Sequence, residues 1–566
     1  MKFMHFSKDK CNHCYRCLRA CDSKAIKILD DIARIEDDLC IACGQCYTVC
    51  PQHAISINNY IQDVKDAIKD NKKIIASIAP SFPGAFELDD SGQIVSALKK
   101  LGFSIVEETS IGAEIVIDYY REYVEKGEYK NLISTSCPAA NYLVEKYYPS
   151  LVDYMIPVVS PMIAHGKILK HMYGMDSYVV FIGPCIAKKY ESKDFEHEGV
   201  IDSVLTFEEL SQWIINENIN IKSLKPEKFD RRSSKSGNLF PISGSVFSHN
   251  IDKKNCKYDF ITVNDIKECK EILSYLESGS IENLCVELNV CNGSCIGGPG
   301  MPKDNSNYYS RYERVRKYVS NKEYIENEDI HKMTHMLNFH KKFFDKKVDR
   351  KIASPEEMRN ILRNMGKYEE KDELNCNACG YQTCKEKAQS VYEGMSEIKM
   401  CLPFMKTKAD SLKNVIFEYS PNVIFLLDNN LFVKEFNPTS ERVFNINSEN
   451  IIGKPISFII KDDLFLKVKE TKQNLIKEKM SFPQYGVTLF TNILYLNEEN
   501  VILAIMTDIT KNEKNKKELV RVKENTFNAA QEVINKQMRV AQEIASLLGE
   551  TTAETKMILT KLKEML

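Results

Sequence analysis

The sequence predicts a multidomain α/β protein, and three observations support this fold class. Its 566 residues suffice for roughly three to five domains, and its 43% hydrophobic residues suffice for several ordinary cores. Its 19 cysteines gather in a few segments, which predicts separate metal-binding modules. Beyond residue 60, strand-like stretches such as KKIIASIAP (72–80) alternate with helical ones such as SGQIVSALKKLGF (91–103), a pattern typical of α/β domains.

Charge and hydropathy exclude two classes of partner. The net charge of −2 leaves no basic surplus, so we expect neither nucleic acid nor an anionic membrane as a partner. No apolar run reaches the roughly 18 residues that a membrane helix needs. The amino terminus, MKFMHFSKDKCNHC, leads into cysteines without a hydrophobic signal segment. We therefore expect a cytoplasmic protein.

Residues 1–60 carry the spacing CxxCxxCxxxC twice, which predicts a ferredoxin-like module with two [4Fe–4S] clusters. Cytosolic thiols stay reduced, so cysteines clustered in this way favour metal over disulfides. In two-cluster ferredoxins the fourth cysteine of each run ligates the other cluster. We expect one cubane on Cys11, Cys14, Cys17 and Cys50, and a second on Cys40, Cys43, Cys46 and Cys21. The alternative, a pair of zinc knuckles, does not use this third-cysteine spacing.

Residues 61–330 form the predicted α/β domain, in which apolar runs end in turns that carry reactive side chains. The turns are IAPS (78–81), ISTSCP (133–138) and FIGPCIAKKYE (181–191). In α/β folds, ligands bind beyond the carboxyl ends of the strands. A further bend, CVELNVCNGSCIGGPGM (285–301), places Cys291 and Cys295 four residues apart among glycines. A single buried cysteine is most often a small hydrophobe, but this set downstream of a ferredoxin-like module favours a shared metal site.

Residues 1 to about 310 resemble an [FeFe]-hydrogenase, whose catalytic domain carries three cysteine signatures in the same order. The matching segments are TSCP (135–138), GPCIAKKYE (183–191) and VCNGSCIGG (290–298). The resemblance implies that a four-iron cubane is held by Cys137, Cys185, Cys291 and Cys295. It also implies that the Cys295 sulfur bridges to a diiron subsite with CO, CN and an azadithiolate bridge, which completes the H-cluster.

The resemblance implies roles for further side chains around the diiron subsite. Lys188 matches the lysine that hydrogen-bonds one cyanide ligand, a role for a compact cationic donor. Ala79, Pro80 and Ser81 match the loop beside the other cyanide. Glu191 matches a carboxylate near the cluster.

The sequence also departs from the family pattern. Fast hydrogenases carry a proton-relaying cysteine where this chain has Ser136. A thiol with a pKa near 8.5 ionises transiently, whereas a hydroxyl does not, so we expect slow turnover. Gly183 and Asn289 replace family methionines. The glutamates of the family's proton path have no clean match, which leaves Glu114 and Asp118, one helical turn apart, as candidates.

Residues 331–410 are predicted to be a linker followed by a small α-helical iron–sulfur domain. The linker contains His331, His335 and His340, for which a solvated helix face is a simpler interpretation than a metal site. The segment NCNACGYQTCKEKA (375–388) resembles a four-cysteine iron–sulfur domain of redox enzymes and sensors. Its ligands would be Cys376, Cys379, Cys384 and Cys401, and four thiolates without a histidine favour a [4Fe–4S] cluster over zinc. We interpret Cys256, Cys269 and Cys285 as structural.

Residues 411–512 resemble an α+β PAS sensor domain. The predicted strands are VIFLLD (423–428), LFVKEFN (431–437), GVTLFTNILYL (486–496) and VILAIMTDIT (501–510). No cysteine follows Cys401 and no histidine follows His340, so a histidine-ligated haem and a cysteinyl flavin adduct are excluded here. We expect a relay or dimerisation module.

Residues 513–566 show heptad spacing and predict a coiled-coil signalling helix in a parallel homodimer. One seam contains Val520, Phe527, Ile534, Ala541, Leu548 and Leu562, and the other contains Ala530, Ile544, Ile558 and Met565. The alternative is a helix that folds back on its own domain, because polar residues interrupt both seams. Without a histidine to phosphorylate, the helix itself is not a histidine kinase, so the signalling partner must be a separate protein.

These features predict a sensory [FeFe]-hydrogenase that reacts slowly and reversibly with H₂. The expected partners are H₂ and protons, a ferredoxin or another redox protein, hydrogenase maturation proteins, and a downstream kinase or phosphatase. Two alternatives stay open. One is a ferredoxin-dependent, H₂-evolving hydrogenase with a regulatory tail, and the other is a non-catalytic iron–sulfur scaffold without the diiron subsite.

Overall fold

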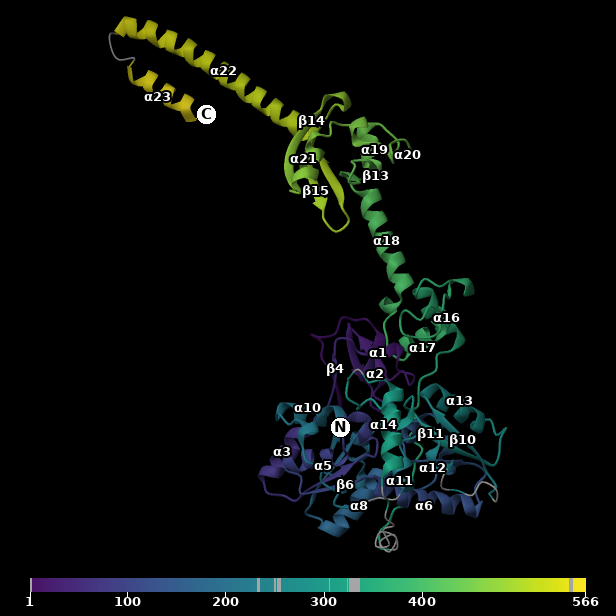
Figure 1. Cartoon of the computed structure of the whole chain (residues 1–566). Helices are drawn as coiled ribbons and strands as arrows, with labels where there is room; N and C mark the ends of the chain where they lie inside the picture. The colour runs from purple at the N-terminus through teal and green to yellow at the C-terminus, as the bar shows by residue number, and fades with distance from the viewer. Residues whose placement is uncertain are drawn as a thin grey trace. The chain divides into compact units, whose positions relative to one another are not determined.

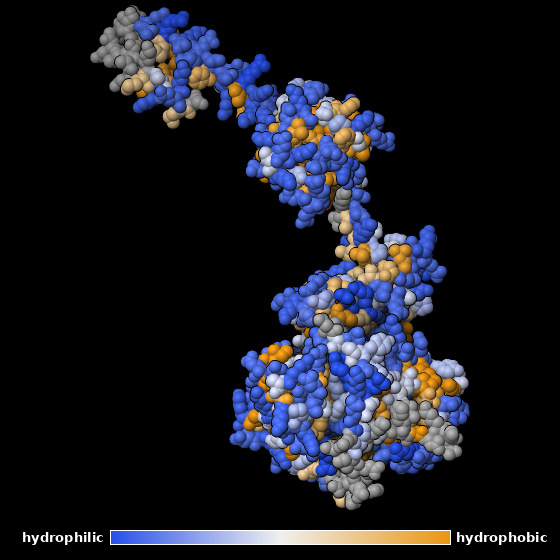
Figure 2. Space-filling model, viewed as in Figure 1, coloured by the Kyte–Doolittle hydropathy of each residue, from blue (hydrophilic) through white to orange (hydrophobic). Residues whose placement is uncertain are grey.

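The structure is a computed structural model, and it describes residues 3–231, 235–248, 251, 256–304, 306–322, 324, 336–548 and 553–565. The chain divides into two compact units, Met1–Phe404 and Met405–Leu566 (Figure 1). Among the described residues, no helix is both long and apolar enough to cross a bilayer. The visible surface in Figure 2 is mostly hydrophilic, with hydrophobic patches scattered over it.

The amino-terminal module is built from two short antiparallel ladders and two short helices. Its elements are β1 (Met4–Phe6), α1 (Arg16–Arg19), β2 (Ile26–Leu29), β3 (Ile32–Ile35), α2 (Gln45–Val49) and β4 (Ile55–Ile57). Strand β1 pairs with β4, and β2 pairs with β3 through a turn at Asp30 and Asp31, both with positive φ. Each helix lies within one of the two cysteine runs, so the module repeats one structural unit twice.

The main sheet of the central domain is parallel, with strand order β6-β5-β8-β9. Its strands are β5 (Ile74–Ile78), β6 (Ile105–Glu108), β8 (Tyr178–Gly183) and β9 (Ser203–Thr206). All five residues of β5 are buried, as expected for a parallel sheet covered on both faces. The helices before, between and after these strands include α3 (Ile61–Lys69), α5 (Gly92–Lys100), α8 (Pro161–Tyr173) and α10 (Phe207–Asn216).

A second parallel sheet, in the order β10-β11-β7, completes the central domain. Its strands are β7 (Leu132–Ile133), β10 (Asp259–Asn264) and β11 (Leu284–Asn289), with helices α6 (Ser110–Lys126), α7 (Pro138–Tyr147) and α13 (Ile266–Glu277). Helix α6 packs closely on α8, because a Cβ at Gly112 would lie 2.3 Å from the Pro161 carbonyl oxygen. The carboxyl ends of β5, β7, β8 and β11 are each followed by a predicted site residue, so the two sheets position the site.

Short segments complete the first unit. The helices are α4 (Phe82–Ala85), α9 (Ala187–Glu191), α11 (Lys235–Leu239), α12 (Ser245–Ser248), α14 (Tyr308–Asn321), α16 (Pro355–Asn364) and α17 (Cys384–Tyr392). The 3₁₀ segments are Pro149–Tyr154, Phe195–His197, Ile221–Ser223, Ser294–Gly297, Glu370–Asp372 and Ile398–Met400.

The predicted linker is partly wrong, because the end of that segment belongs to the first unit. Phe339 is fully buried in the main core, and its carbonyl accepts a hydrogen bond from the Val159 N–H at 2.9 Å. His340 forms a β-bridge with Val158. His331 and His335 lie outside the described residues. Phe339 and the ion pairs of Lys341 with Asp194 and of Lys346 with Glu145 anchor this segment to the domain, and the local charge pattern did not indicate those contacts.

The second unit contains a five-stranded antiparallel sheet in the order β13-β12-β16-β15-β14. Its elements are α18 (Leu402–Tyr419), β12 (Val423–Leu427), β13 (Val433–Phe436), α19 (Pro438–Phe444), α20 (Ser448–Ile451), 3₁₀ segments Ile456–Phe458 and Pro483–Tyr485, α21 (Asp463–Thr471), β14 (Leu475–Phe482), β15 (Val487–Leu496) and β16 (Val501–Asp508). Phe425, Phe436, Phe444 and Phe465 form its aromatic core.

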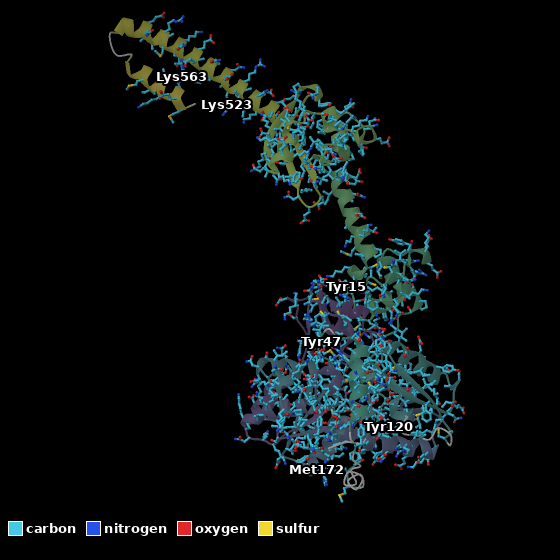
Figure 3. The ribbon with its side chains drawn as sticks, viewed as in Figure 1. Tyr15, Tyr47, Tyr120, Met172, Lys523 and Lys563 are labelled. Atoms are coloured by element: carbon cyan, nitrogen blue, oxygen red, sulfur yellow. The ribbon has the colours of Figure 1, made fainter. Side chains whose placement is uncertain are left out.

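The carboxyl-terminal segment forms two helices, α22 (Thr510–Leu548) and α23 (Ala553–Met565). Residues 549–552, which lie between these two helices, are outside the described residues, so the predicted coiled-coil helix stays a prediction. Phe527 and Ile534 of α22 line a groove with Leu559 and Leu562 of α23, and all of these except Leu559 are predicted seam residues. Figure 3 labels Lys523 and Lys563 on these two facing helices. The groove lies between two helices of the tail and not between the tail and the sheet, so the fold-back alternative and the homodimer both stay predictions.

Candidate metal-cluster sites

A small cavity of about 60 Å³ lies where the second parallel sheet meets the turn after β8. It is lined by six of the predicted site residues, namely Ser136, Cys137, Cys185, Lys188, Cys291 and Cys295. Two of the cysteines follow strands β7 and β8, and the other two follow β11. The fold thus gathers four thiols from three segments into one enclosure, which we call the central pocket.

The donor set of the central pocket fits an anionic thiolate cluster. Burial raises the pKa of Cys185 to about 11 and that of Cys295 to about 12, while the Lys188 ammonium opposes both shifts. Metal binding replaces such thiol protons, and a nearby cation compensates the resulting charge. Among the residues that the structure describes, no group of three or more His, Cys, Asp or Glu side chains has the arrangement for a metal ion. The shared lining of this pocket is the geometric evidence for the site.

The bend at residues 291–298 requires glycine for two physical reasons. Gly293 has φ +76°, in the left-handed region that side chains disfavour. A Cβ at Gly297 would lie 1.9 Å from the Asn292 carbonyl oxygen, so no side chain fits there. The glycines allow one tight bend to bring Cys291 and Cys295 to the same pocket.

Lys188 is held by Glu191, one helical turn further along α9. Its Nζ donates to Glu191 Oε2 at 2.7 Å and lies 3.4 Å from the Ser136 carbonyl oxygen. The same Glu191 oxygen accepts a hydrogen bond from Ser160 Oγ at 2.9 Å. All these side chains are buried. Glu191 therefore acts on the pocket indirectly, by orienting the ammonium group of Lys188.

The turn at residues 79–81 lies next to β8 but does not line the central pocket. The Ala79 N–H donates to the Ile182 carbonyl at 2.8 Å, and the Ala79 Cβ would lie 3.1 Å from a Cβ at Gly183. Ser81 is 1% exposed, and its Oγ has no hydrogen-bond partner among the described residues. A buried hydroxyl without a partner is costly, so it fits a site whose occupant supplies an acceptor.

Tyr120, which sequence reasoning did not single out, contacts Ser136 directly. Tyr120 is fully buried on α6, and its hydroxyl lies 2.8 Å from Ser136 Oγ (Figure 3). It also accepts a hydrogen bond from the Thr135 N–H at 2.7 Å, and burial raises its pKa to about 12. The candidates Glu114 and Asp118 lie on the same helix, where Glu114 is buried and Asp118 pairs with Arg121 at 3.0 Å.

Glu287 is a second pocket residue that sequence reasoning missed. It lies on β11, is 3% exposed, and lines the central pocket. Burial raises its pKa to about 7, although the Asn289 side chain and the backbone N–H groups of Gly244 and Val246 favour its charged form. A charged residue inside the apolar run LCVELN was the available signal. This carboxyl can exchange a proton near neutral pH.

The amino-terminal module brings its cysteines together in the two sets that the ferredoxin spacing predicts. One cavity is lined by Cys11, Cys14, Cys17 and Cys50. The other four are close enough to interact electrostatically, because Cys21 and Cys43 are both among the groups that raise the pKa of Cys46, after burial itself. Backbone N–H groups of Ala25, Ala42 and Ala54 each donate to a cysteine sulfur at 3.3 Å.

A further cavity contains the four cysteines of the carboxyl-terminal part of the first unit. It is lined by Cys376, Cys379, Cys384 and Cys401. This small domain contacts the amino-terminal module directly. Lys24 Nζ donates to the Gly380 carbonyl at 2.9 Å, and a Cβ at Gly380 would lie 2.8 Å from Leu18 Cγ. Leu18 follows Cys17 and Gly380 follows Cys379, so the two predicted cluster sites meet at residues adjacent to their ligands.

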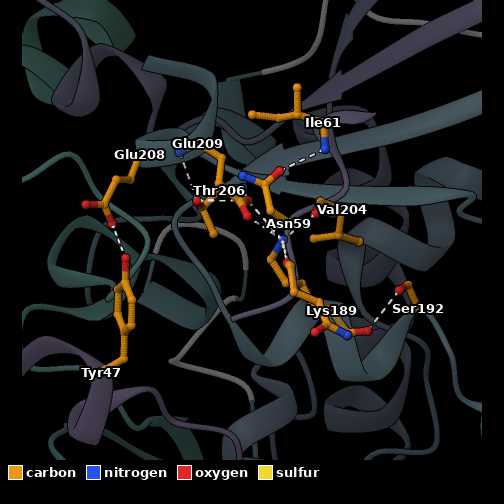
Figure 4. A network of polar contacts seen from close by, with 10 residues as sticks. Tyr47, Asn59, Ile61, Lys189, Ser192, Val204, Thr206, Glu208 and Glu209 are labelled. Atoms are coloured by element: carbon orange, nitrogen blue, oxygen red, sulfur yellow. Dashed lines mark hydrogen bonds and ion pairs between the residues drawn. The ribbon is translucent and has the colours of Figure 1, made fainter. Parts of the chain in front are cut away.

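A polar network joins the amino-terminal module to the central domain (Figure 4). Tyr47 donates to Glu208 at 2.8 Å. Lys189, which is fully buried, bonds Glu209 at 2.9 Å and donates to the carbonyls of Asn58 and Val204. Because Lys189 follows Lys188, this network also fixes helix α9 beside the central pocket.

Comparison with known proteins finds similarities for these parts. Residues 72–299 match the iron only hydrogenase large subunit, C-terminal domain, and residues 33–56 match a 4Fe-4S binding domain. Residues 372–403 match a family of iron–sulfur cluster segments. The chain is 27% identical over 421 residues to Iron hydrogenase 1 of Clostridium pasteurianum, an alignment that spans 61% of this chain and 73% of that protein.

Two further proteins are similar to this chain, one over a shorter segment and the other at lower identity. The chain is 36% identical over 109 residues to the cytosolic Fe-S cluster assembly factor NAR1 of Vanderwaltozyma polyspora, which spans 19% of this chain and 20% of that protein. A variant of the [FeFe]-hydrogenase HydA1 from Chlamydomonas reinhardtii superposes with a TM-score of 0.41 at 16% identity. That superposition covers 50% of this chain and 99% of the solved one.

The family matches and the cysteine-lined pockets agree in indicating iron–sulfur sites. The segment most similar to a catalytic domain is residues 72–299, which are similar to the iron-only hydrogenase large subunit, and it follows a segment similar to a 4Fe-4S binding domain.

Proposed function

We propose that this protein is a sensory [FeFe]-hydrogenase of the cytoplasm, which oxidises H₂ slowly and reversibly and signals to a separate protein. The observation that carries the proposal is the central pocket, where four cysteines, Lys188 and Ser136 converge in a hydrogenase-type domain. The signalling role is supported by the order of the chain. The four-cysteine domain ends at Cys401, and helix α18 begins at the next residue and leads into the PAS-like sheet.

The chain's own residues define what each part of the pocket contributes. Cys137, Cys185, Cys291 and Cys295 would hold the H-cluster, and the eight cysteines of residues 1–60 would hold two cubanes. When bound, the H-cluster would supply the metal chemistry that splits and forms H₂. Lys188, oriented by Glu191, would donate hydrogen bonds to an anionic ligand, and the unpartnered hydroxyl of Ser81 would donate another.

Slow turnover follows from the protonation chemistry of the pocket. The hydroxyls of Ser136 and Tyr120 form a hydrogen-bonded pair, and neither ionises near neutral pH. They can pass a proton only when another group accepts it at the same time. The carboxyl of Glu287, with a pKa of about 7, is suited to take or give a proton in this pocket. Because Glu287 would exchange the proton where fast hydrogenases use a cysteine thiol, we expect a rate of H₂ turnover below theirs.

The test is infrared spectroscopy of the anaerobically matured, full-length protein. We expect bands of CO and CN⁻ that change under H₂ and a low rate of H₂ oxidation with an artificial electron acceptor. Cys295→Ala should remove these bands and the activity while sparing the clusters of residues 1–60, because those ligands lie in a separate module. The structural cysteine variant Cys256→Ser is the matched control and should keep both signals.

The same spectra separate the competing functions. The likeness to a cytosolic Fe-S cluster assembly factor favours a non-catalytic scaffold as the second candidate. A scaffold would give iron–sulfur signals but no CO or CN⁻ bands, and that result would reject the hydrogenase proposal. A ferredoxin-dependent, H₂-evolving enzyme with a regulatory tail would show the bands together with high turnover.

A further inference from the structure

Lys387 is a buried lysine without a carboxylate partner in the ion pairs of the described residues. It lies on α17, three residues after Cys384, and its relative exposure is 0%. Its Nζ contacts the Met400 sulfur at 3.4 Å and lies 5.2 Å from the centre of the Tyr381 ring. Neither group neutralises a full positive charge. A buried ammonium group is costly unless an anion is near it.

The cavity beside Lys387 can hold such an anion. Lys387 lines the same enclosure as Cys376, Cys379, Cys384 and Cys401. Burial lowers the pKa of Lys387 to about 8, and Cys379, Cys401 and, after them, the Glu397 carboxylate oppose that shift. A metal cluster on four thiolates is anionic, so its charge and that of Lys387 compensate each other.

We propose that Lys387 raises the reduction potential of the cluster held by these four cysteines, so that this site retains electrons delivered through the amino-terminal module. The inference rests on the proposed function in one respect, the presence of a [4Fe–4S] cluster at this site. Reduction adds one electron, and therefore one negative charge, to an already anionic group. The buried ammonium stabilises the reduced form more than the oxidised form, because the added charge interacts with it in a medium of low polarity.

The position of the site supports the role as an electron acceptor. The Arg19 guanidinium donates to the Ala378 carbonyl at 3.3 Å, and the Leu18 side chain packs on Gly380, so side chains next to Cys17 touch the backbone next to Cys379. An electron from the amino-terminal clusters has this contact as a direct route. A higher potential at the far end of the route would draw the electron toward Cys401, the residue before helix α18.

The test is a potentiometric titration of the full-length protein, followed by electron paramagnetic resonance, with dithionite as reductant and no H₂. The signal of this cluster is assigned by its loss in Cys376→Ser. In Lys387→Met we expect the equilibrium constant for reduction to fall at least tenfold, a downward shift of about 59 mV for one electron. The matched control is Lys385→Met, which removes the same charge from an exposed position of the same helix and should change the constant less than about threefold.

Three outcomes overturn the proposal. They are an unchanged midpoint in Lys387→Met, an equal shift in Lys385→Met, and a wild-type protein in which these cysteines give no titratable iron–sulfur signal. If Lys387→Met and Lys387→Gln both lose the cluster, Lys387→Arg decides. Retention of the cluster with arginine supports charge compensation, whereas loss in all three variants assigns Lys387 a packing role. Because no step uses H₂, a protein that fails as a hydrogenase still gives a clear answer here.

Discussion

At the residue scale, the central pocket combines a complete set of thiols with an unusual set of proton carriers. Lys188 and Glu191 form a buried ion pair beside the cysteines, and Ser136 pairs with Tyr120 where fast hydrogenases have a thiol. Glu287 provides the pocket with a carboxyl that titrates near neutral pH. The protonation of these few side chains should therefore control the rate.

Ser136→Cys should raise the rate of H₂ turnover about tenfold or more. A thiol ionises far more readily than a hydroxyl, and at this position it would keep the neighbouring Tyr120 hydroxyl as a hydrogen-bond partner. The measurement is H₂ oxidation with an artificial acceptor, compared with Ser134→Cys, which places a thiol elsewhere in the same pocket. An unchanged rate with an intact cluster would show that proton delivery is not limiting.

Glu287→Gln should lower H₂ oxidation about tenfold or more and remove a pH dependence near 7. H₂ oxidation releases protons, so the base form is required, and the wild-type rate should rise as pH rises through the Glu287 pKa of about 7. Glutamine cannot titrate, so the variant's profile should be flat in this window. The control is Glu282→Gln, an exposed carboxylate beside the same strand. A variant that keeps the wild-type profile would exclude Glu287 as the proton carrier.

At the element scale, short segments are positioned by buried charges. Helix α9 has only five residues, yet it carries both Lys188 and Lys189. Lys189 connects α9 to Glu209 on α10 and to backbone carbonyls on either side. Such a helix is too short to be stable alone, so its position depends on these contacts.

Lys189→Met should destabilise the central domain by about 3–5 kcal/mol, because it leaves Glu209 buried without its cation. The chain has one tryptophan, Trp213 on the adjacent α10, so its fluorescence during denaturant unfolding reports on this domain. The exposed neighbour Lys193→Met should change the unfolding free energy by no more than about 0.5 kcal/mol. Equal effects of the two substitutions would contradict the buried ion pair.

At the scale of the whole molecule, the chain runs from the segment that matches a hydrogenase domain through the four-cysteine segment into the second unit. Cys401 belongs to the third cysteine-lined cavity and immediately precedes α18. The cavity is therefore connected through the backbone to helix α18, which leads into the second unit. A few kcal/mol of coupling between two sites is the usual scale of allosteric control.

Cys379→Ser should leave H₂ oxidation with an artificial acceptor largely intact but abolish H₂-dependent signalling. In the wild type we expect amide hydrogen exchange across residues 413–566 to differ between H₂ and N₂, and in the variant we expect no difference. Cys256→Ser, outside all four predicted cluster sites, should behave like the wild type. If the wild type shows no difference between the gases, or Cys379→Ser keeps it, this cluster is not the relay.

Much of the site was predictable because metal ligands leave a pattern along the chain. Short spacings such as CxxCxxCxxxC and the bend around Cys291 and Cys295 reflect how closely one loop can supply several ligands to a cluster. The alternation of strands and helices predicted the α/β domain for a similar local reason, because each element carries its own periodicity. The order of the predicted modules likewise followed from the order of the motifs in the sequence, without any contact between distant residues.

Only the tertiary structure revealed the side chains that tune the site. The Tyr120 hydroxyl meets Ser136 across sixteen positions of sequence, and Glu287 and Lys387 become unusual only through burial. The groove between α22 and α23 and the burial of Phe339 also depend on contacts between separate segments. The sequence by itself determined which residues can bind metal, since ligand spacing is covalent and local. Tertiary structure decided which groups exchange protons or compensate charge, since pKa values and reduction potentials depend on surroundings that distant parts of the chain supply.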